Sequence, residues 1–309
     1  MRFFYASIAA LCLVCASCVS CVNRGGKAPV TDPAKYVPEI PSPPVMMDPA
    51  GQRDYLCRHY WDNMAFGDST VPSRIDSAAF RTLFVNYAVL LAQEPQAGPG
   101  LIGDLMQKAG QNEPVLDLFG GLARMVFYDP NSPLRSDDLY IPVLEALSQS
   151  PLKDPESRDN AAWTLQLISR NRPGTLAEDF SYLTIQNRPG SLYGIKAPYT
   201  LLFFSNPGCD MCRAIREQMA ASSVISEMVR SRKLVVLALY PDEDTDLWLS
   251  YRDEIPSQWI NARDPMSTLH ESGLYDLKAI PSLYLLDADK TVILKDCTEV
   301  SVIEAALSK

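Results

Sequence analysis

The chain has 309 residues, of which 47% are hydrophobic and 21% charged, and its formal net charge is −9 at neutral pH. This length suffices for about two domains, and the composition is that of a folded globular protein. Binding to phosphates needs clustered Lys and Arg, so the negative charge and the lack of a long basic run exclude nucleic acid as the expected partner.

The N-terminus carries one early positive charge, then an apolar stretch and then small residues, which is typical of a secretory signal. Small residues directly precede both Cys18 and Cys21. This arrangement resembles the bacterial lipoprotein signal, although a cysteine stands where that pattern usually has leucine. The resemblance implies a signal over residues 1–21 and a lipidated cysteine, with Cys18 preferred over Cys21. An uncleaved membrane anchor and a soluble secreted form remain alternatives.

A lipoprotein of this kind would be lipid-anchored in the bacterial cell envelope and face the periplasm or the cell exterior, where stable disulfides are permitted. Residues 22–49 are poor in large apolar side chains and rich in proline. Such a stretch cannot bury a core and favours extended conformations, so we expect a Pro-rich linker.

Residues 50–172 show apolar residues at three- and four-residue spacing, as in Phe80, Phe84, Tyr87 and Leu91, which predicts helices. The expected helical segments are 51–66, 77–93, 101–109, 114–129, 138–149 and 156–170. They indicate a small all-helical domain without a catalytic constellation. The run His59–Asn63, followed by Phe66-x-Asp68, is similar to the opening of a helical domain of unknown function that precedes thioredoxin-like modules.

From residue 175 onward, short apolar runs alternate with helical ones. Core strands are expected at 200–204, 233–240, 282–287 and 291–296, edge strands at 179–184 and 191–193, and helices at 211–231 and 300–307. A strand, helix, strand order implies a parallel pair with a crossover. The later hairpin and the final helix complete an α/β domain over residues 175–309, with a central mixed sheet flanked by helices.

Cys209 and Cys212 follow the first core strand, and Ile280-Pro281 precedes the hairpin. This arrangement resembles the thioredoxin superfamily and, more closely, the membrane-tethered thiol-disulfide oxidoreductases of the bacterial envelope. The resemblance implies that Pro281 is the cis-proline facing the cysteine pair and that the backbone of Ile280 contacts the substrate.

Two cysteines at i and i+3 share one side of a helical turn and can form a disulfide. At a helix N-terminus the unpaired N–H groups and the helix dipole stabilise a thiolate, which is the nucleophile. Cys209 is therefore expected to attack a substrate disulfide and Cys212 to resolve the mixed disulfide. Half of a zinc site and an inert structural disulfide are the alternatives; zinc needs four ligands, and no second pair exists outside the signal.

The residues around the pair are expected to contact the substrate; these are Pro207, Gly208, Asp210 and Met211. Asp210 disfavours a thiolate, whereas Arg213 and Arg216 favour it. The familiar thioredoxin pattern has Trp just before the first cysteine and an acidic residue six positions before it. Gly208 and Phe203 occupy these places here, so the usual proton acceptor for the resolving cysteine is missing.

The remaining candidates are interpreted as packing or hydrogen-bonding residues: Cys57, Cys297, His59, His270, Trp248 and Trp259. A Cys57–Cys297 disulfide is an alternative for the two cysteines. The sequence therefore predicts a membrane-tethered thiol-disulfide oxidoreductase without metal or cofactor, acting in the reductase or isomerase direction. Its partners would be protein thiols and disulfides and a membrane electron donor. The rival hypothesis is a non-enzymatic lipoprotein whose helical domain binds a partner.

Overall fold

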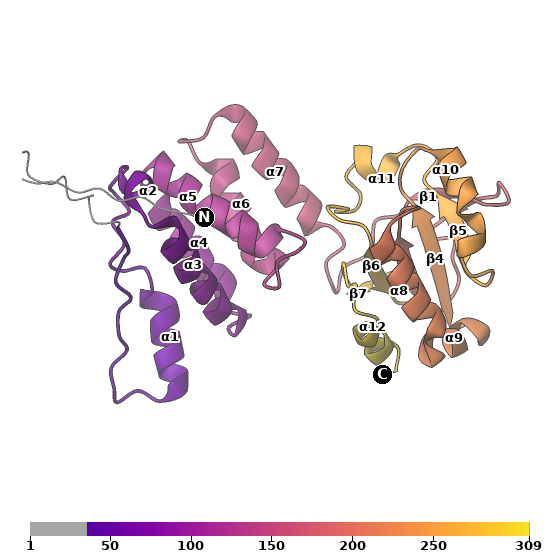
Figure 1. The fold of residues 1–309 in the computed structure, drawn as a ribbon, viewed down its shortest axis with the longest axis horizontal. Coiled ribbons are helices and arrows are strands. Elements are labelled where there is room, and N and C mark those ends of the chain that lie inside the picture. Colours follow the sequence, from indigo (N-terminus) through magenta and orange to yellow (C-terminus); the bar gives the residue numbers. More distant parts are fainter. Residues whose placement is uncertain (1–35, 309) are drawn as a thin grey trace, which may run out of the picture. The chain divides into compact units, whose positions relative to one another are not determined.

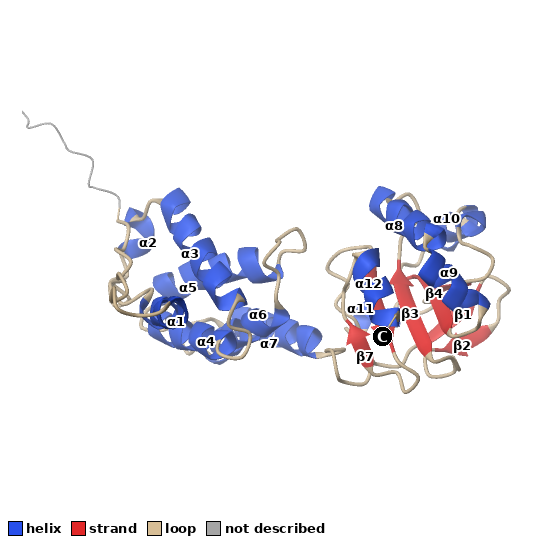
Figure 2. Ribbon diagram, turned by 90° about the horizontal axis from the view of Figure 1, so that it is seen from below, coloured by secondary structure: helices blue, strands red, loops and turns tan. Residues whose placement is uncertain are grey.

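The computed structural model describes residues 36–308. Its first part is helical, and every strand lies in the second part (Figure 2). The helices of the first part are α1 (Pro49–His59), α2 (Val71–Arg74), α3 (Ser77–Ala92), α4 (Gly98–Ala109), α5 (Glu113–Ala123), α6 (Asp137–Gln149) and α7 (Pro155–Ser169), and a π-helical turn (Arg124–Tyr128) follows α5 (Figure 1). The periodicity located these segments, except that it missed the four-residue α2.

Side chains at the helix N-termini explain where several helices begin. Asp76 accepts hydrogen bonds from the backbone N–H groups of Ala78 and Ala79, and Asn112 accepts one from Val115. Each of these contacts satisfies a backbone donor that has no partner within the helix. These caps thus explain why α3 begins directly after Asp76 and α5 directly after Asn112.

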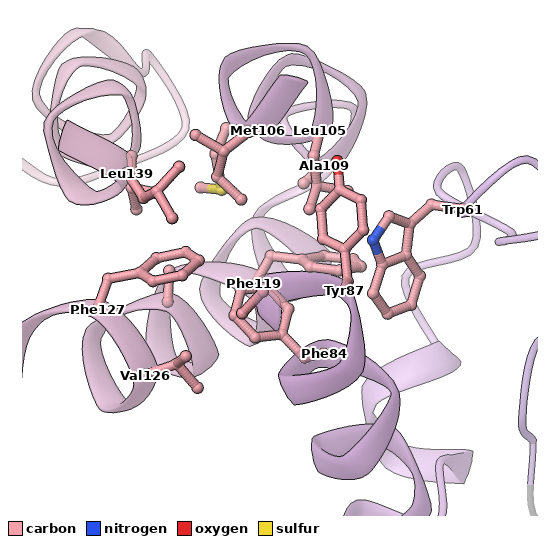
Figure 3. Packing of buried hydrophobic residues seen from close by; sticks show 14 of the residues in the cluster. Trp61, Phe84, Tyr87, Leu105, Met106, Ala109, Phe119, Val126, Phe127 and Leu139 are labelled. Carbon is pink, nitrogen blue, oxygen red and sulfur yellow. The ribbon is translucent and has the colours of Figure 1, made fainter. Parts of the chain in front are cut away.

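Aromatic residues form the centre of the helical core. Phe119 lies 5.1 Å from Trp61 and 5.7 Å from Phe80 between ring centroids. Figure 3 shows the rings of Trp61, Phe84, Tyr87, Phe119 and Phe127 gathered between the helices. Apolar burial of this extent is the main stabilising contribution for a bundle of this size.

Part of the expected linker packs against this core. Tyr36 and Ile40 contact the helical core, and Tyr36 pairs with Ile75 as an isolated parallel bridge. The backbone N–H of Ala65 donates to the Tyr36 hydroxyl over 3.0 Å. The spacer interpretation therefore does not hold for residues 36–40, because large apolar side chains in this otherwise proline-rich stretch find a surface to cover.

The second part contains one seven-stranded mixed sheet in the order β2-β1-β5-β4-β3-β6-β7. The strands are β1 (Ser181–Thr184), β2 (Pro189–Ser191), β3 (Tyr199–Phe204), β4 (Leu234–Tyr240), β5 (Ile260–Arg263), β6 (Ser282–Leu286) and β7 (Val292–Leu294). Strand β3 runs parallel to β4 and antiparallel to β6. The carboxyl ends of β3, β4 and β5 therefore meet at one edge of the sheet.

Helices and loops cover both faces of this sheet. The helices are α8 (Asp210–Ala221), α9 (Ser223–Arg230), α10 (Thr245–Ser250), α11 (Thr268–Glu271) and α12 (Val300–Leu307), with a 3-10 turn at Arg252–Glu254. Leu201 and Phe203 pack with α8, α9 and α12, whereas Leu202 and Phe204 face the opposite core. All four are buried, as a central strand with two covered faces requires. The expected α/β thioredoxin-like fold, preceded by helices, is confirmed.

Two local expectations were wrong. The helix expected over 211–231 is two helices, because Ser222 adopts an extended conformation and its hydroxyl accepts from the N–H of Ile225. The strand β5 was missed because it has only four residues, too few for the alternation of Ile260 and Ala262 with polar residues to be distinctive.

Membrane attachment is not visible in the described part of the chain. None of the helices within residues 36–308 is both long and apolar enough to cross a bilayer. The expected signal at 1–21, with Cys18 and Cys21, lies outside the described residues, as does the first half of the expected linker.

Candidate redox site

The cysteine pair lies where β3 ends and α8 begins. Gly208 has a backbone φ of +73°, which L-residues with a side chain rarely adopt. This conformation turns the chain sharply from the strand into the helix. Cys209 is the N-cap residue of α8, so its side chain is held at the positive end of the helix.

Cys209 and Cys212 are joined by a disulfide, with their Cα atoms 5.2 Å apart. The backbone N–H of Cys212 points at the sulfur of Cys209 over 3.1 Å. That N–H would stabilise a thiolate on Cys209 once the disulfide is reduced. Cys212 is 2% exposed, whereas Cys209 is partly exposed. The sulfur of Cys209 is therefore the accessible one of the pair, and Cys212 is shielded from solvent.

The segment before β6 faces this pair. The peptide bond Ile280-Pro281 is cis, and the Ile280 carbonyl oxygen lies 3.9 Å from the sulfur of Cys209. These two segments are 71 residues apart in the sequence. The fold thus brings Ile280 and Pro281 to the pair, as the sequence predicted.

A cleft of 280 Å³ opens beside the pair. Its lining includes Asn206, Cys209, Cys212, Arg216, Tyr251 and Glu254. Pro207, Gly208 and Asp210 also line it, in agreement with their expected position. Met211 does not line this cleft; its side chain is 61% exposed beside the pair.

The charged side chains beside the cysteine pair, whose effects on a thiolate were expected to oppose each other, form ion pairs. Asp210 lies 2.6 Å from Arg213, and Arg216 lies 2.6 Å from Glu254. The Asp210 side chain is 90% exposed, and exposed pairs of this kind contribute little. Each of the two arginines near the pair thus has a carboxylate partner, and the Arg216 side chain is only 15% exposed.

The surroundings of Cys212 are apolar. Phe203 and Trp259 share its core cluster, with the two rings 6.4 Å apart between centroids. Phe203 is completely buried. Position 203 thus holds a ring that can accept no proton, and Cys212 itself lines the cleft.

Sequence reasoning missed a polar chain beside the site. The Asn206 amide donates to Asp242 over 2.7 Å, and the opposite carboxylate oxygen of Asp242 lies 3.4 Å from Nε2 of His270. Asn206 follows β3, Asp242 follows β4, and His270 belongs to α11. The parallel register, in which Phe204 pairs with Leu239, brings the ends of β3 and β4 together. In the sequence, this contact could have been suspected from the position of Asn206 and Asp242, each just after one of two neighbouring strands.

Of the other candidates, Trp248 lines the cleft and Trp259 packs in the cluster of Cys212, whereas Cys57 and His59 belong to α1. Cys57 and Cys297 are free thiols, so the alternative disulfide between them is not formed. His59 contacts Asp62 over 2.7 Å, and Trp248 and Trp259 are buried, in agreement with packing roles. Among residues 36–308, no cluster of three or more His, Cys, Asp or Glu side chains is arranged to hold a metal.

Comparison with known proteins places these features in a family. A domain of unknown function, DUF5106, matches residues 20–171. The crystal structure of a thioredoxin-like protein from Bacteroides caccae is similar over 88% of this chain and 98% of that one, with 36% identity and a TM-score of 0.82. The C-terminal domain of an uncharacterized protein from Bacteroides fragilis is 43% identical over 45% of this chain and 99% of its own, with a TM-score of 0.44.

A thioredoxin domain of a thiol-disulfide oxidoreductase from Bacteroides vulgatus is also similar, at 16% identity over 44% of this chain and 98% of its own, with a TM-score of 0.38. None of the curated proteins compared matches this chain. Fold and cysteine placement define a protein of the thioredoxin-like class. The chain belongs to the thioredoxin-like proteins, here with an N-terminal helical domain of unknown function.

Proposed function

We propose that this protein is a thiol-disulfide oxidoreductase that exchanges disulfides with protein substrates through Cys209 and Cys212. The observation that carries the proposal is the disulfide at the N-cap of α8, whose outer sulfur lies 3.9 Å from the Ile280 carbonyl oxygen. Fold alone does not define activity. An accessible thiol, a second thiol that can resolve a mixed disulfide, and a backbone segment on which a substrate can dock together suit thiol-disulfide exchange.

The reaction starts from the dithiol form. The Cys209 thiolate attacks a substrate disulfide, one sulfur bonds to Cys209, and the other substrate sulfur leaves as a thiolate and takes a proton. Cys212 then loses its proton and attacks the mixed disulfide. The substrate leaves as a dithiol, and Cys209–Cys212 is oxidised. Two electrons and two protons from a membrane electron donor would restore the dithiol form.

The substrate would dock against the backbone at Ile280, beside Pro281, in an extended conformation. Pro207, Gly208, Asp210 and Met211 would border the docked segment. We place the protein in the bacterial cell envelope, anchored by a lipid on Cys18 or Cys21, and propose the reductase or isomerase direction. The N–H of Cys212 supports a reactive thiolate on Cys209.

Trapping tests the proposal. The Cys212→Ser variant should accumulate mixed disulfides with envelope proteins, because no thiol remains to release them. The matched control Cys297→Ser removes a free thiol outside the pair and should trap nothing. Adding Cys209→Ser to the trap variant should abolish the adducts. If no adduct forms and the purified protein reduces no disulfide, the non-enzymatic hypothesis replaces this one.

A further inference from the structure

The cleft beside the cysteine pair contains a carboxylate to which the proposed reaction gives no role. Glu254 ends the 3-10 turn that follows α10, and it lines the cleft together with Cys212. Its side chain is 41% exposed. The cleft volume of 280 Å³ leaves room for several waters. Glu254 and Cys212 therefore border one space that water can enter.

Arg216 connects Glu254 to the helix that carries Cys212. Arg216 follows Cys212 by four residues in α8, and residues four apart lie on the same face of a helix. Helical side chains lean toward the helix N-terminus, which is the direction of Cys212 from Arg216. The Arg216 guanidinium donates to the Glu254 carboxylate over 2.6 Å and is largely shielded from solvent. This ion pair thus holds Glu254 at the face of α8 where Cys212 lies.

Among the described residues, Asp210 is the other carboxylate that lines the cleft, and it is less well placed. Asp210 stands two residues before Cys212, and residues two apart on a helix do not face each other. Its side chain is 90% exposed and accepts a hydrogen bond from Arg213 over 2.6 Å. Glu254 is therefore the better-placed acceptor for a proton that leaves Cys212.

The other titratable and charged groups around Glu254 do not suit this role. Tyr240 and Tyr251 line the cleft, but a tyrosine hydroxyl is an acid rather than a base near neutral pH. Arginines can only donate hydrogen bonds. On its other side, Glu254 borders a second hollow together with Arg188, Arg252 and Asp253. Arg252 and Asp253 lie 3.8 Å apart as an exposed pair, which contributes little.

Given the proposed function, on which this step rests, we infer that Glu254 is the proton acceptor for Cys212 and that Arg216 positions it. In the mixed disulfide, the Cys212 thiol passes its proton to the Glu254 carboxylate through one water in the cleft. The Cys212 sulfur then bonds to the Cys209 sulfur, and the bond from Cys209 to the substrate sulfur breaks. The leaving substrate thiolate takes up the proton from Glu254. No further reactant is needed, because the electrons and the proton stay among these groups.

The two exchange steps can be timed separately in the purified full chain. Dithiobis(nitrobenzoic acid), mixed with the dithiol form, releases one coloured thiolate when Cys209 attacks and a second when Cys212 resolves the mixed disulfide. The Cys209→Ser variant gives the background from the other thiols. Glu254→Gln should leave the first phase unchanged. It should slow the second phase about 100-fold at neutral pH, at the lower end of what positioned proton transfer contributes.

The pH dependence of the second phase separates proton acceptance from a structural role. In Glu254→Gln only solvent removes the Cys212 proton, so the second phase should rise about tenfold per pH unit until it reaches the wild-type rate. If Glu254 merely neutralised Arg216, the same substitution would free the guanidinium, favour the Cys212 thiolate and speed the second phase. Glu254→Asp keeps a carboxylate and should retain the wild-type pH profile.

Glu227→Gln is the matched control, because Glu227 pairs with Arg230 over 2.7 Å on the exposed side of α9, outside the cleft. It should change neither phase. A second phase in Glu254→Gln that is unchanged, faster, or slower by one factor at every pH would overturn the inference alone.

The wild type gives a test that needs no variant. Its second phase should change little from neutral to alkaline pH, because Glu254 removes the proton. A tenfold rise per pH unit in the wild type would contradict the role of Glu254. Absence of the first phase in the wild type would instead refute the proposed function, and the role of Glu254 with it.

Discussion

Phe203 occupies the position beside Cys212 where the thioredoxin pattern has a carboxylate. Its ring is fully buried and shares an apolar cluster with Cys212 and Trp259. In the proposed reaction, an acid at this place would receive the proton that Cys212 loses before it attacks a mixed disulfide. We therefore expect resolution by Cys212 to depend on water reaching it through the cleft that Arg216 and Glu254 border.

Gly208 is the residue that lets the chain turn into α8. With φ at +73°, an alanine side chain is strained at this position, by roughly 1–2 kcal/mol. Gly208→Ala should lower the free energy of unfolding by about that amount, measured by urea denaturation. Gly121 in α5 has nothing within 4 Å of an added Cβ, so the control Gly121→Ala should raise stability by about 0.5–1 kcal/mol. Equal stability of Gly208→Ala and wild type would contradict the strain.

Tyr140 links stability to alkaline pH. Burial raises its pKa from 10.0 to about 12. Because the folded-state pKa is raised, the stabilising contribution is fully present below pH 10 and is lost as the pH rises towards 12. Tyr140→Phe should flatten this loss, by up to about 2 kcal/mol, in unfolding measured across that range. Identical pH slopes for variant and wild type would show that Tyr140 does not carry the effect.

At the scale of elements, Ser222 separates α8 from α9. Its hydroxyl accepts from the Ile225 N–H over 3.1 Å and donates to Glu304 of α12. Ser222→Ala should cost about 1 kcal/mol of stability, because it removes a cap from α9. Ser223 is exposed at the first position of α9, so the control Ser223→Ala should remain within about 0.5 kcal/mol of wild type. A comparable loss in both variants would argue against capping.

The same serine shows where sequence reasoning reached its limit. Apolar periodicity located the long helices and the central strands, because each of these buries a continuous face. It could not place the break at Ser222, which depends on hydrogen bonds to Ile225 and Glu304. Nor could it find β5, whose alternating pattern spans only four residues.

The site was predictable to a similar degree. Cys209, Cys212 and Pro281 were found because their spacing and their place among the strands resemble a known family. The contact between Asn206 and Asp242 was missed, because it requires the register of β3 against β4, which a sequence pattern does not supply. The ion pair between Arg216 and Glu254 was beyond sequence reasoning for the same reason, because it joins α8 to a turn far along the chain.

At the scale of the whole molecule, the expected lipid on Cys18 decides where the chain acts. Cys18→Ala should abolish incorporation of labelled palmitate and move the protein from the membrane to the soluble fraction in cell fractionation. Cys21→Ala should leave both unchanged, which makes it the matched control. Labelling that survives Cys18→Ala but not Cys21→Ala would move the lipid to Cys21, and no labelling of the wild type would rule out the anchor.

The outer strands of the sheet determine how copies of this protein behave at high concentration. On β7, the backbone oxygen of Val292 accepts from Gly174 and its N–H donates to Thr175, so the backbone groups of this residue are already occupied. On the opposite side, β2 is three residues long and includes Pro189, which has no N–H to offer. Neither margin presents a long row of free backbone groups. Neighbouring molecules therefore lack a template for joining their sheets, and the protein can reach high local concentration without polymerising through these strands.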